Sequence, residues 1–145
     1  MIPKLKTMGL TFVRSIPASP TAVYHAWLDP KNPGCPWNGA EKADFKPKVG
    51  GFFYMLHRSD EGVDLPHYGR FLTLKKGEKF QVTWMSRHTQ GLESVLTVTF
   101  KQEGGGTLMT LKHDGLPDTK FGRVHKNGWE YFLPLFTGHL APKKR

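Results

Sequence analysis

The residues of this sequence best suited to chemistry are its histidines, whose imidazole rings can hold a metal ion or move a proton near neutral pH. They are His25, His57, His67, His88, His113, His125 and His139. No two of them have the spacing of a zinc-binding His-Glu-x-x-His motif. His57 and His67 could face each other across a pair of strands, with His113 approaching the same space. We therefore expect these rings to pack and to form hydrogen bonds, with no metal site and no cofactor.

Acid–base chemistry would require one of these histidines to lie beside a carboxylate. His113 or His57 with Asp114 or Glu93 could in principle move protons. The sequence has no set of nucleophile, base and orienting residue, and the single cysteine, in a Gly-Cys-Pro turn, has no neighbour that would activate its thiol. We predict no catalytic residue and keep an enzyme as an alternative.

The aromatic residues fit another role, as walls of a core or of a ligand pocket. The candidate pocket residues are mostly apolar. Four of them, His57, His67, Tyr68 and His113, carry a polar group that could orient a ligand. The set is Trp37, Phe53, Met55, His57, His67, Tyr68, Trp84, His113, Trp129, Phe132, Leu133 and Phe136. The pattern leaves open whether these side chains fill a solid core or line a cavity.

The composition is typical of a globular protein. The 145 residues are 38% hydrophobic, with a mean hydropathy of −0.45, which fits one domain over residues 1–145 and not a disordered chain. The longest strictly apolar run, residues 52–56, is far below a membrane span, and the N-terminus lacks the apolar segment of a secretory signal. One cysteine excludes an internal disulfide and a cysteine metal cluster. We expect a cytoplasmic protein with no membrane partner.

The formal net charge of +9 could indicate a nucleic-acid partner. However, the basic residues are scattered over a predicted turn at residues 75–79 and over both chain ends. No basic run is interleaved with aromatic residues on one predicted face. We therefore favour a solvated cationic surface and expect no specific nucleic-acid partner.

Most of the chain has the alternating pattern of β-strands. Strands are expected at residues 11–16, 43–45, 52–58, 67–75, 80–86, 94–102 and 107–113, and a polar loop at 59–66. Ser19 and Pro20 predict the start of a short helix that Asp29 and Pro30 end. A second short helical turn is expected around Trp37.

The last part of the chain has apolar residues at helical spacing and predicts one helix over residues 120–140, capped by Asp118 or Thr119. At 1.5 Å per residue it would be about 31 Å long. Gly128 on its apolar face predicts close contact with a sheet, so that Gly128→Leu would destabilise the fold by roughly 1–3 kcal/mol. Pro134 is expected to kink or break the helix.

This order of elements predicts an α+β fold, in which a curved antiparallel sheet of about six to seven strands packs against the long C-terminal helix. Two short helices would follow the first strand and close one end. The concave face of the sheet and the helix would then enclose a core or a cavity, within residues of about 10–140.

Several motifs occur in the order of a known family. They are Ile16-Pro17-Ala18-Ser19-Pro20, Ala26-Trp27-Leu28-Asp29-Pro30, Val49-Gly50-Gly51-Phe52-Phe53, Gly69-Arg70-Phe71, Thr83-Trp84, Gly106-Thr107 with Leu111, His113 and Gly115, and His125-Lys126-Asn127-Gly128-Trp129. With them the chain resembles bacterial single-domain proteins similar to the activator of heat-shock-protein-ninety ATPase, in the START-like (SRPBCC, helix-grip) superfamily. The resemblance covers residues 10–140. It implies a sheet that grips the C-terminal helix around an apolar cavity.

The same resemblance implies several functions, because this scaffold serves lipid carriage, polyketide cyclisation, hormone sensing and co-chaperone work. Our leading expectation is binding of a small apolar or aromatic molecule in the cavity. The alternatives are a co-chaperone-like protein that engages a chaperone through its surface, and a cyclase- or hydrolase-like enzyme using the same cavity. The chain departs from the family at Pro134 and at Phe52 and Tyr54, two aromatics in outward positions that could contact a partner or a second copy in a homodimer.

Overall fold

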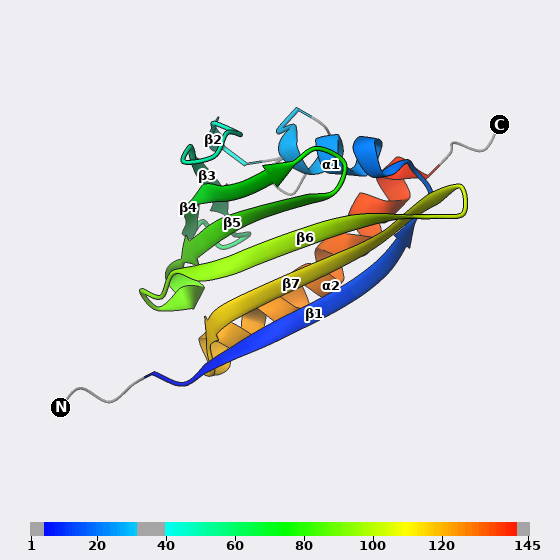
Figure 1. Ribbon diagram of the computed structural model, residues 1–145. Helices are drawn as coiled ribbons and strands as arrows, with labels where there is room; N and C mark the ends of the chain where they lie inside the picture. Colours follow the sequence, from blue (N-terminus) through cyan, green and yellow to red (C-terminus); the bar gives the residue numbers. More distant parts are fainter. Residues whose placement is uncertain (1–4, 32–39, 142–145) are drawn as a thin grey trace.

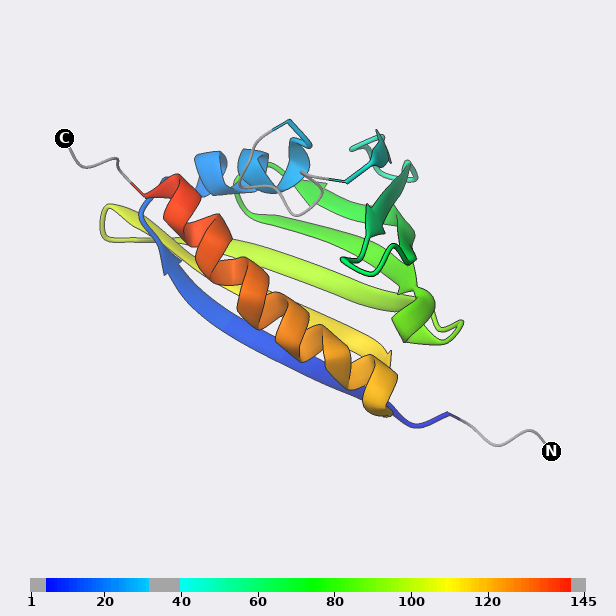
Figure 2. The same cartoon turned by 180° about the vertical axis from the view of Figure 1, so that it is seen from behind.

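The computed structural model describes residues 5–31 and 40–141. One antiparallel sheet curves around a long helix, which crosses its concave face diagonally (Figures 1 and 2). The seven strands are β1 (Thr7–Ile16), β2 (Lys42–Phe45), β3 (Phe52–Arg58), β4 (Asp64–Lys75), β5 (Lys79–Ser86), β6 (Ser94–Glu103) and β7 (Gly106–Pro117). They lie in the order β1-β7-β6-β5-β4-β3-β2. The predicted α+β helix-grip architecture is confirmed.

The short helix α1 (Pro20–Leu28) begins where the sequence predicts. The hydroxyl of Ser19 accepts a hydrogen bond from the backbone N–H of Ala22 at 3.1 Å, and Pro20 occupies the first helical position. The helix packs against one end of the sheet (Figure 2), where Trp27 is fully buried and donates its indole N–H to the sulfur of Met109 at 3.1 Å. The second short helix predicted around Trp37 lies outside the described residues.

The long helix α2 (Lys120–Leu140) has the predicted bounds. The hydroxyl of Thr119 accepts from the backbone N–H of Gly122 and caps its start. Pro134 lies inside the helix without interrupting it, so the prediction of a break is wrong. Pro134 and Glu130 are both exposed. Water can therefore satisfy the Glu130 carbonyl that loses its helical partner.

Alternation along the strands places one set of side chains against α2 and the other on the outer face of the sheet. On β3, Phe53 and Met55 are buried, whereas Phe52 and Tyr54 are exposed. The inner set joins the apolar side of α2 in one core, whose α2 members are Trp129, Leu133 and Phe136. None of the described helices is long and apolar enough to cross a lipid bilayer.

Strand β4 begins three residues earlier than predicted, at Asp64 instead of His67. The polar loop expected at residues 59–66 is therefore shorter than predicted. Pro66 pairs only with Leu56 of β3, and pairing with β5 starts at His67. Since β4 has a single neighbour there, a residue without an N–H is tolerated. A short 3₁₀ turn, η1 (Arg87–Thr89), follows β5 and was not predicted.

Close approach between α2 and the sheet occurs at Gly122 and not at Gly128. A Cβ atom at Gly122 would collide with the backbone oxygen of Pro117, whereas a Cβ at Gly128 would meet nothing within 4 Å. The prediction of a tight contact at Gly128 is therefore wrong.

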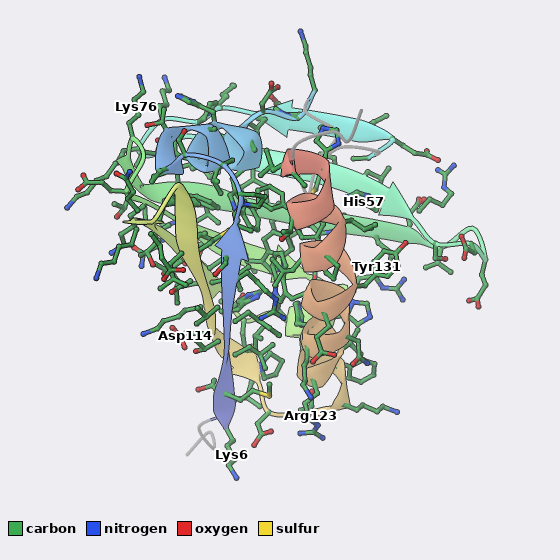
Figure 3. All side chains as sticks on the ribbon, turned by 90° about the vertical axis from the view of Figure 1, so that its right-hand side faces the viewer. Lys6, His57, Lys76, Asp114, Arg123 and Tyr131 are labelled. Atoms are coloured by element: carbon green, nitrogen blue, oxygen red, sulfur yellow. The ribbon has the colours of Figure 1, made fainter. Side chains whose placement is uncertain are left out.

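Asp118, just before α2, is also linked by charge to Lys6, the residue that precedes β1. Asp118 pairs with Arg123 at 2.8 Å and with Lys6 at 3.7 Å, and Figure 3 shows Lys6 and Arg123 at the same end of the molecule. Together with the contact at Gly122, these pairs hold the first turn of α2 against the sheet.

Candidate functional site: a pocket between the sheet and the long helix

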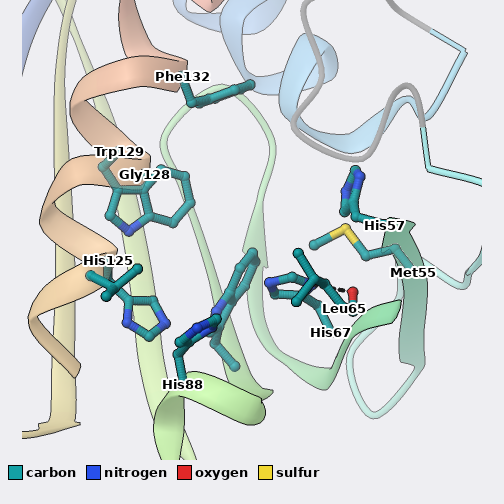
Figure 4. A pocket seen from close by; sticks show the side chains of 11 residues that line it. Met55, His57, Leu65, His67, His88, His125, Gly128, Trp129 and Phe132 are labelled. Atoms are coloured by element: carbon teal, nitrogen blue, oxygen red, sulfur yellow. Dashed lines mark hydrogen bonds between the residues drawn. The ribbon is translucent and has the colours of Figure 1, made fainter. Parts of the chain in front are cut away.

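A cavity of about 280 Å³ lies between α2 and the inner face of β3, β4 and β5, with η1 at one end (Figure 4). Its described walls are apolar, aromatic or imidazole side chains, and none of them is Asp, Glu, Lys or Arg. The lining residues are Met55, His57, Leu65, His67, Trp84, His88, Val124, His125, Gly128, Trp129 and Phe132. Gly128 and Val124 are exposed, so the cavity is open to solvent beside α2.

One wall is an aromatic surface made by residues far apart in the chain. The rings of Trp84 on β5 and Trp129 on α2 are inclined to each other with centroids 5.6 Å apart. Phe132, one turn beyond Trp129, lies edge-on to it at 6.0 Å. On the other side His67 meets Trp84 edge-on at 5.2 Å. Each such pair contributes roughly 0.5–1.5 kcal/mol of stability beyond the burial of its surface, and these contacts favour a rigid wall.

Behind this wall a buried hydrogen-bond chain holds Trp129 in place. The indole N–H of Trp129 donates to Nδ1 of His113 at 3.1 Å, so that ring carries its proton on Nε2. Nε2–H then donates to Oγ of Ser94 at 2.8 Å, and Ser94 donates to the backbone oxygen of Trp84 at 2.6 Å. The side chains of Ser94 and His113 are fully buried. Every member of the chain thus has its partner, as buried polar groups require.

The histidines of the pocket come from four different elements: His57 from β3, His67 from β4, His88 from η1 and His125 from α2. The rings of His57 and His67 are 5.8 Å apart, and those of His88 and His125 are 6.4 Å apart. His113 lies behind His125, with the centroids of the two rings 5.1 Å apart. Five of the seven histidines of the chain therefore gather in and behind one pocket.

Burial favours the neutral form of four of these imidazoles, those of His57, His67, His113 and His125. Desolvation, followed by the charge of His57, lowers the pKa of His67 to about 4. Desolvation also lowers the pKa of His57 and His125, and it lowers the pKa of His113 well below the usual value. The described lining thus holds no Asp, Glu, Lys or Arg, and burial favours the neutral form of His57, His67 and His125.

Two of the lining histidines have a defined tautomer. Nδ1 of His67 is 3.0 Å from the backbone oxygen of Leu65, and Nδ1 of His125 is 2.9 Å from that of Gly122. A carbonyl oxygen only accepts hydrogen bonds, so in both rings Nδ1 carries the proton. Each neutral ring is then left with an acceptor at Nε2.

A metal ion has no evident set of ligands here. Within residues 5–31 and 40–141, no group of three or more His, Cys, Asp or Glu side chains is placed to hold one. Cys35 lies outside the described residues.

The structure brings six of the twelve predicted pocket residues to the cavity: Met55, His57, His67, Trp84, Trp129 and Phe132. Phe53, Leu133 and Phe136 instead lie in the closed core, and His113 lies behind Trp129. Tyr68 is on the outer face, 45% exposed and paired with Tyr54, because it alternates with His67 along β4. Its placement in the pocket was wrong. Trp37 falls outside the described residues.

Five lining residues were missed by the sequence prediction: Leu65, His88, Val124, His125 and Gly128. For His125 and Gly128 a signal existed, because they lie four residues before Trp129 and Phe132 on the same side of α2. Leu65 was missed because a loop, and not a strand, was expected at residues 59–66. Nothing in the local pattern indicates that η1 would direct His88 into the pocket.

The sequence profile described as Activator of Hsp90 ATPase homolog 1-like protein matches residues 17–141. No curated protein sequence gives a match.

Among solved structures, protein CV1439 from Chromobacterium violaceum superposes with a TM-score of 0.82 at 24% identity, covering 93% of this chain and 98% of that one. Mll3558 from Rhizobium loti superposes with a TM-score of 0.77 at 20% identity, covering 95% of this chain and 100% of that one. SA2116 from Staphylococcus aureus superposes with a TM-score of 0.80 at 15% identity, covering 94% of this chain and 95% of that one. At these identities the likeness establishes the fold alone. Since the family profile covers nearly the whole chain, the protein belongs to the Activator of Hsp90 ATPase homolog 1-like family.

Proposed function

We propose that this protein binds a small apolar or aromatic molecule in the pocket between α2 and the sheet. The observation that supports it is the cavity of about 280 Å³, which remains open beside α2 although the core next to it is closed. Its walls are mostly apolar with a few polar groups, as in small-molecule sites generally.

The size of the cavity limits the ligand. An apolar cavity of about 150 Å³ holds benzene, whereas drug-sized ligands occupy roughly 300–1,000 Å³. A volume of about 280 Å³ lies between these cases. It suits a molecule of one or two fused rings, which would lie against Trp84, Trp129 and Phe132.

Naphthalene is a suitable probe for this proposal, because Trp84 and Trp129 report on the pocket by fluorescence. We expect a saturable change in emission on titration, and loss of that change in Gly128→Leu, whose side chain would extend into the opening. Gly138→Leu is the matched control, since Gly138 is also on α2 in open space and does not line the pocket. Absence of any effect in the unmodified protein, or equal binding by both variants, would contradict the proposal.

The alternative expectations would use other features. An interaction with a chaperone or a second copy would use the outer face of β3 and β4, where Phe52 is 69% exposed beside Tyr54 and Tyr68. That surface lies across the sheet from the pocket. An enzyme using the same cavity would have to work with imidazoles alone, because His57, His67, His88 and His125 are the only ionisable side chains among the described lining residues and no carboxylate there orients them. The cytoplasmic location stays a prediction.

A further inference from the structure

We propose that the pocket selects uncharged aromatic molecules that carry a hydrogen-bond donor, such as a phenolic hydroxyl, and that Nε2 of His67 or His125 accepts this donor. The inference rests on the proposed function, because it concerns the chemistry of the ligand in the same cavity. It goes further in naming the atoms that distinguish one aromatic molecule from another.

The first step concerns the direction of hydrogen bonding. The Nδ1–H groups of His67 and His125 are occupied by the carbonyl oxygens of Leu65 and Gly122. In the described structure these are the only side-chain hydrogen bonds of His67 and His125, so Nε2 of each ring stays available, and both rings line the cavity. A neutral imidazole in this tautomer offers only an acceptor, so a ligand gains a bond there only by supplying a donor.

The second step concerns position. Figure 4 shows His67 and His125 on opposite walls, one from β4 and the other from α2, with the labelled ring of Trp129 close to His125. A flat ring that packs against the tryptophans can therefore direct a substituent to one histidine or the other. Both acceptors lie beside an aromatic wall, which matches a hydroxyl attached directly to a ring.

The third step concerns charge. No described lining residue is Lys or Arg, and burial favours the neutral form of the two proposed acceptors, His67 and His125. A ligand carboxylate would lose its water without meeting a cation, which is costly.

The other nearby imidazoles do not alter this preference. His113 already uses both ring nitrogens, toward Trp129 and Ser94. Within the described structure no hydrogen bond fixes the side chain of His57 or of His88, whose one bond uses its backbone N–H. Each can adopt either tautomer and so accepts or donates equally well, without favouring one kind of ligand.

A ligand series on the unmodified protein tests the inference: naphthol, its methyl ether, naphthalene and naphthoate, with the substituent at the same ring position. We expect naphthol to bind roughly 2- to 13-fold more tightly than the ether or naphthalene, the effect of one net hydrogen bond. Equal binding of these three, or tightest binding of naphthoate, would overturn the inference and leave the proposed function standing. If none of the four binds, the proposed function itself fails.

Variants then identify the acceptor. In His67→Phe or His125→Phe the preference for naphthol over its ether should fall to about one, whereas His139→Phe, an exposed site on the same helix, should retain it. If both pocket variants retain the preference, the acceptor assignment is wrong.

Nitrogen chemical shifts of the imidazoles provide a test that requires no substitution. At neutral pH, His67 and His125 should show the Nδ1–H tautomer. Protonation on Nε2 in both rings would remove the basis of the inference.

Discussion

The indole N–H of Trp129 donates to Nδ1 of His113 across 3.1 Å, and this bond joins the aromatic wall of the pocket to the buried polar chain that ends on β5. Because an indole N–H cannot accept, His113 must carry its proton on Nε2, the opposite tautomer from that of His67 and His125. His113 thus has the opposite tautomer from His67 and His125, and in each ring a neighbouring hydrogen-bonding group determines which nitrogen is protonated.

Removing the middle of this chain should destabilise the fold. In Ser94→Ala the Nε2–H of His113 loses its buried acceptor, and we expect a loss of about 1–3 kcal/mol in the free energy of unfolding. Thr99→Ser, at an exposed site on the same strand, should change it by less than about 0.5 kcal/mol. Urea denaturation measures both. Equal midpoints for Ser94→Ala and the unmodified protein would show that the chain contributes nothing to stability.

The two glycines of α2 should respond in opposite ways to alanine. Gly128→Ala should stabilise the protein by roughly 0.5–1 kcal/mol, because the new methyl group meets nothing within 4 Å and alanine favours the helix. Gly122→Ala should destabilise it by about 1–3 kcal/mol, since the methyl group collides with the Pro117 backbone. The measurement is the thermal unfolding midpoint of each variant, compared with that of the unmodified protein. A reversed order would mean that the close contact lies at Gly128 after all.

Stability should fall with acidification between pH 6.5 and about 4. The pKa of His67 is lowered from 6.5 to about 4 in the folded protein, so the unfolded chain binds protons first as the pH falls. This contribution is complete above pH 6.5, decreases below it and is gone below about pH 4. For His67 alone it amounts to about 3 kcal/mol.

His57, His113 and His125 act in the same direction, because desolvation lowers each pKa. The check is the urea midpoint as a function of pH, with His67→Phe as the comparison, since phenylalanine retains a flat ring and does not titrate. The variant should have the shallower profile. Parallel profiles would show that His67 titrates normally in the folded protein.

Core and pocket residues on α2 should separate in their effects on stability and affinity. Leu133→Ala should cost about 2–5 kcal/mol of stability, because Leu133 is fully buried, and leave naphthalene affinity unchanged. Phe132→Ala should cost less stability, because Phe132 is half-buried, and weaken naphthalene roughly 2- to 13-fold by removing an aromatic contact. Denaturation and fluorescence titration measure the two quantities. Unchanged affinity in Phe132→Ala would remove this residue from the site.

The amino-acid sequence by itself determined the elements and their order. Alternation predicted the strands, three- and four-residue spacing predicted α2 with its observed bounds, and Ser19 with Pro20 predicted the start of α1. These features depend on local periodicity and capping, which need no knowledge of distant residues. The family followed from motifs spread along the same elements.

The sequence also contained information that alternation alone could have extracted. His67 and Tyr68 are neighbours on β4 and therefore point to opposite faces, so only one of them could line the pocket. Which of the two it is follows from the register of β3 and β4 in the structure, where Met55 pairs with His67 and Tyr54 pairs with Tyr68.

Only the tertiary structure decided which inward residues meet a void and which meet other side chains. Phe132 and Leu133 are adjacent on α2, yet one lines the cavity and the other is fully buried. Helical spacing indicates the face of a residue but not the distance between that face and the sheet. That distance is set by the contact of Gly122 with Pro117, by the curvature of the strands and by the position of η1. The first contact is local, but the other two depend on residues far apart in the chain. The proton position of His113 depends on the same packing, because α2 brings its partner Trp129 to it from 16 residues away. His67 and His125 instead bind carbonyl oxygens two and three residues before them in the chain.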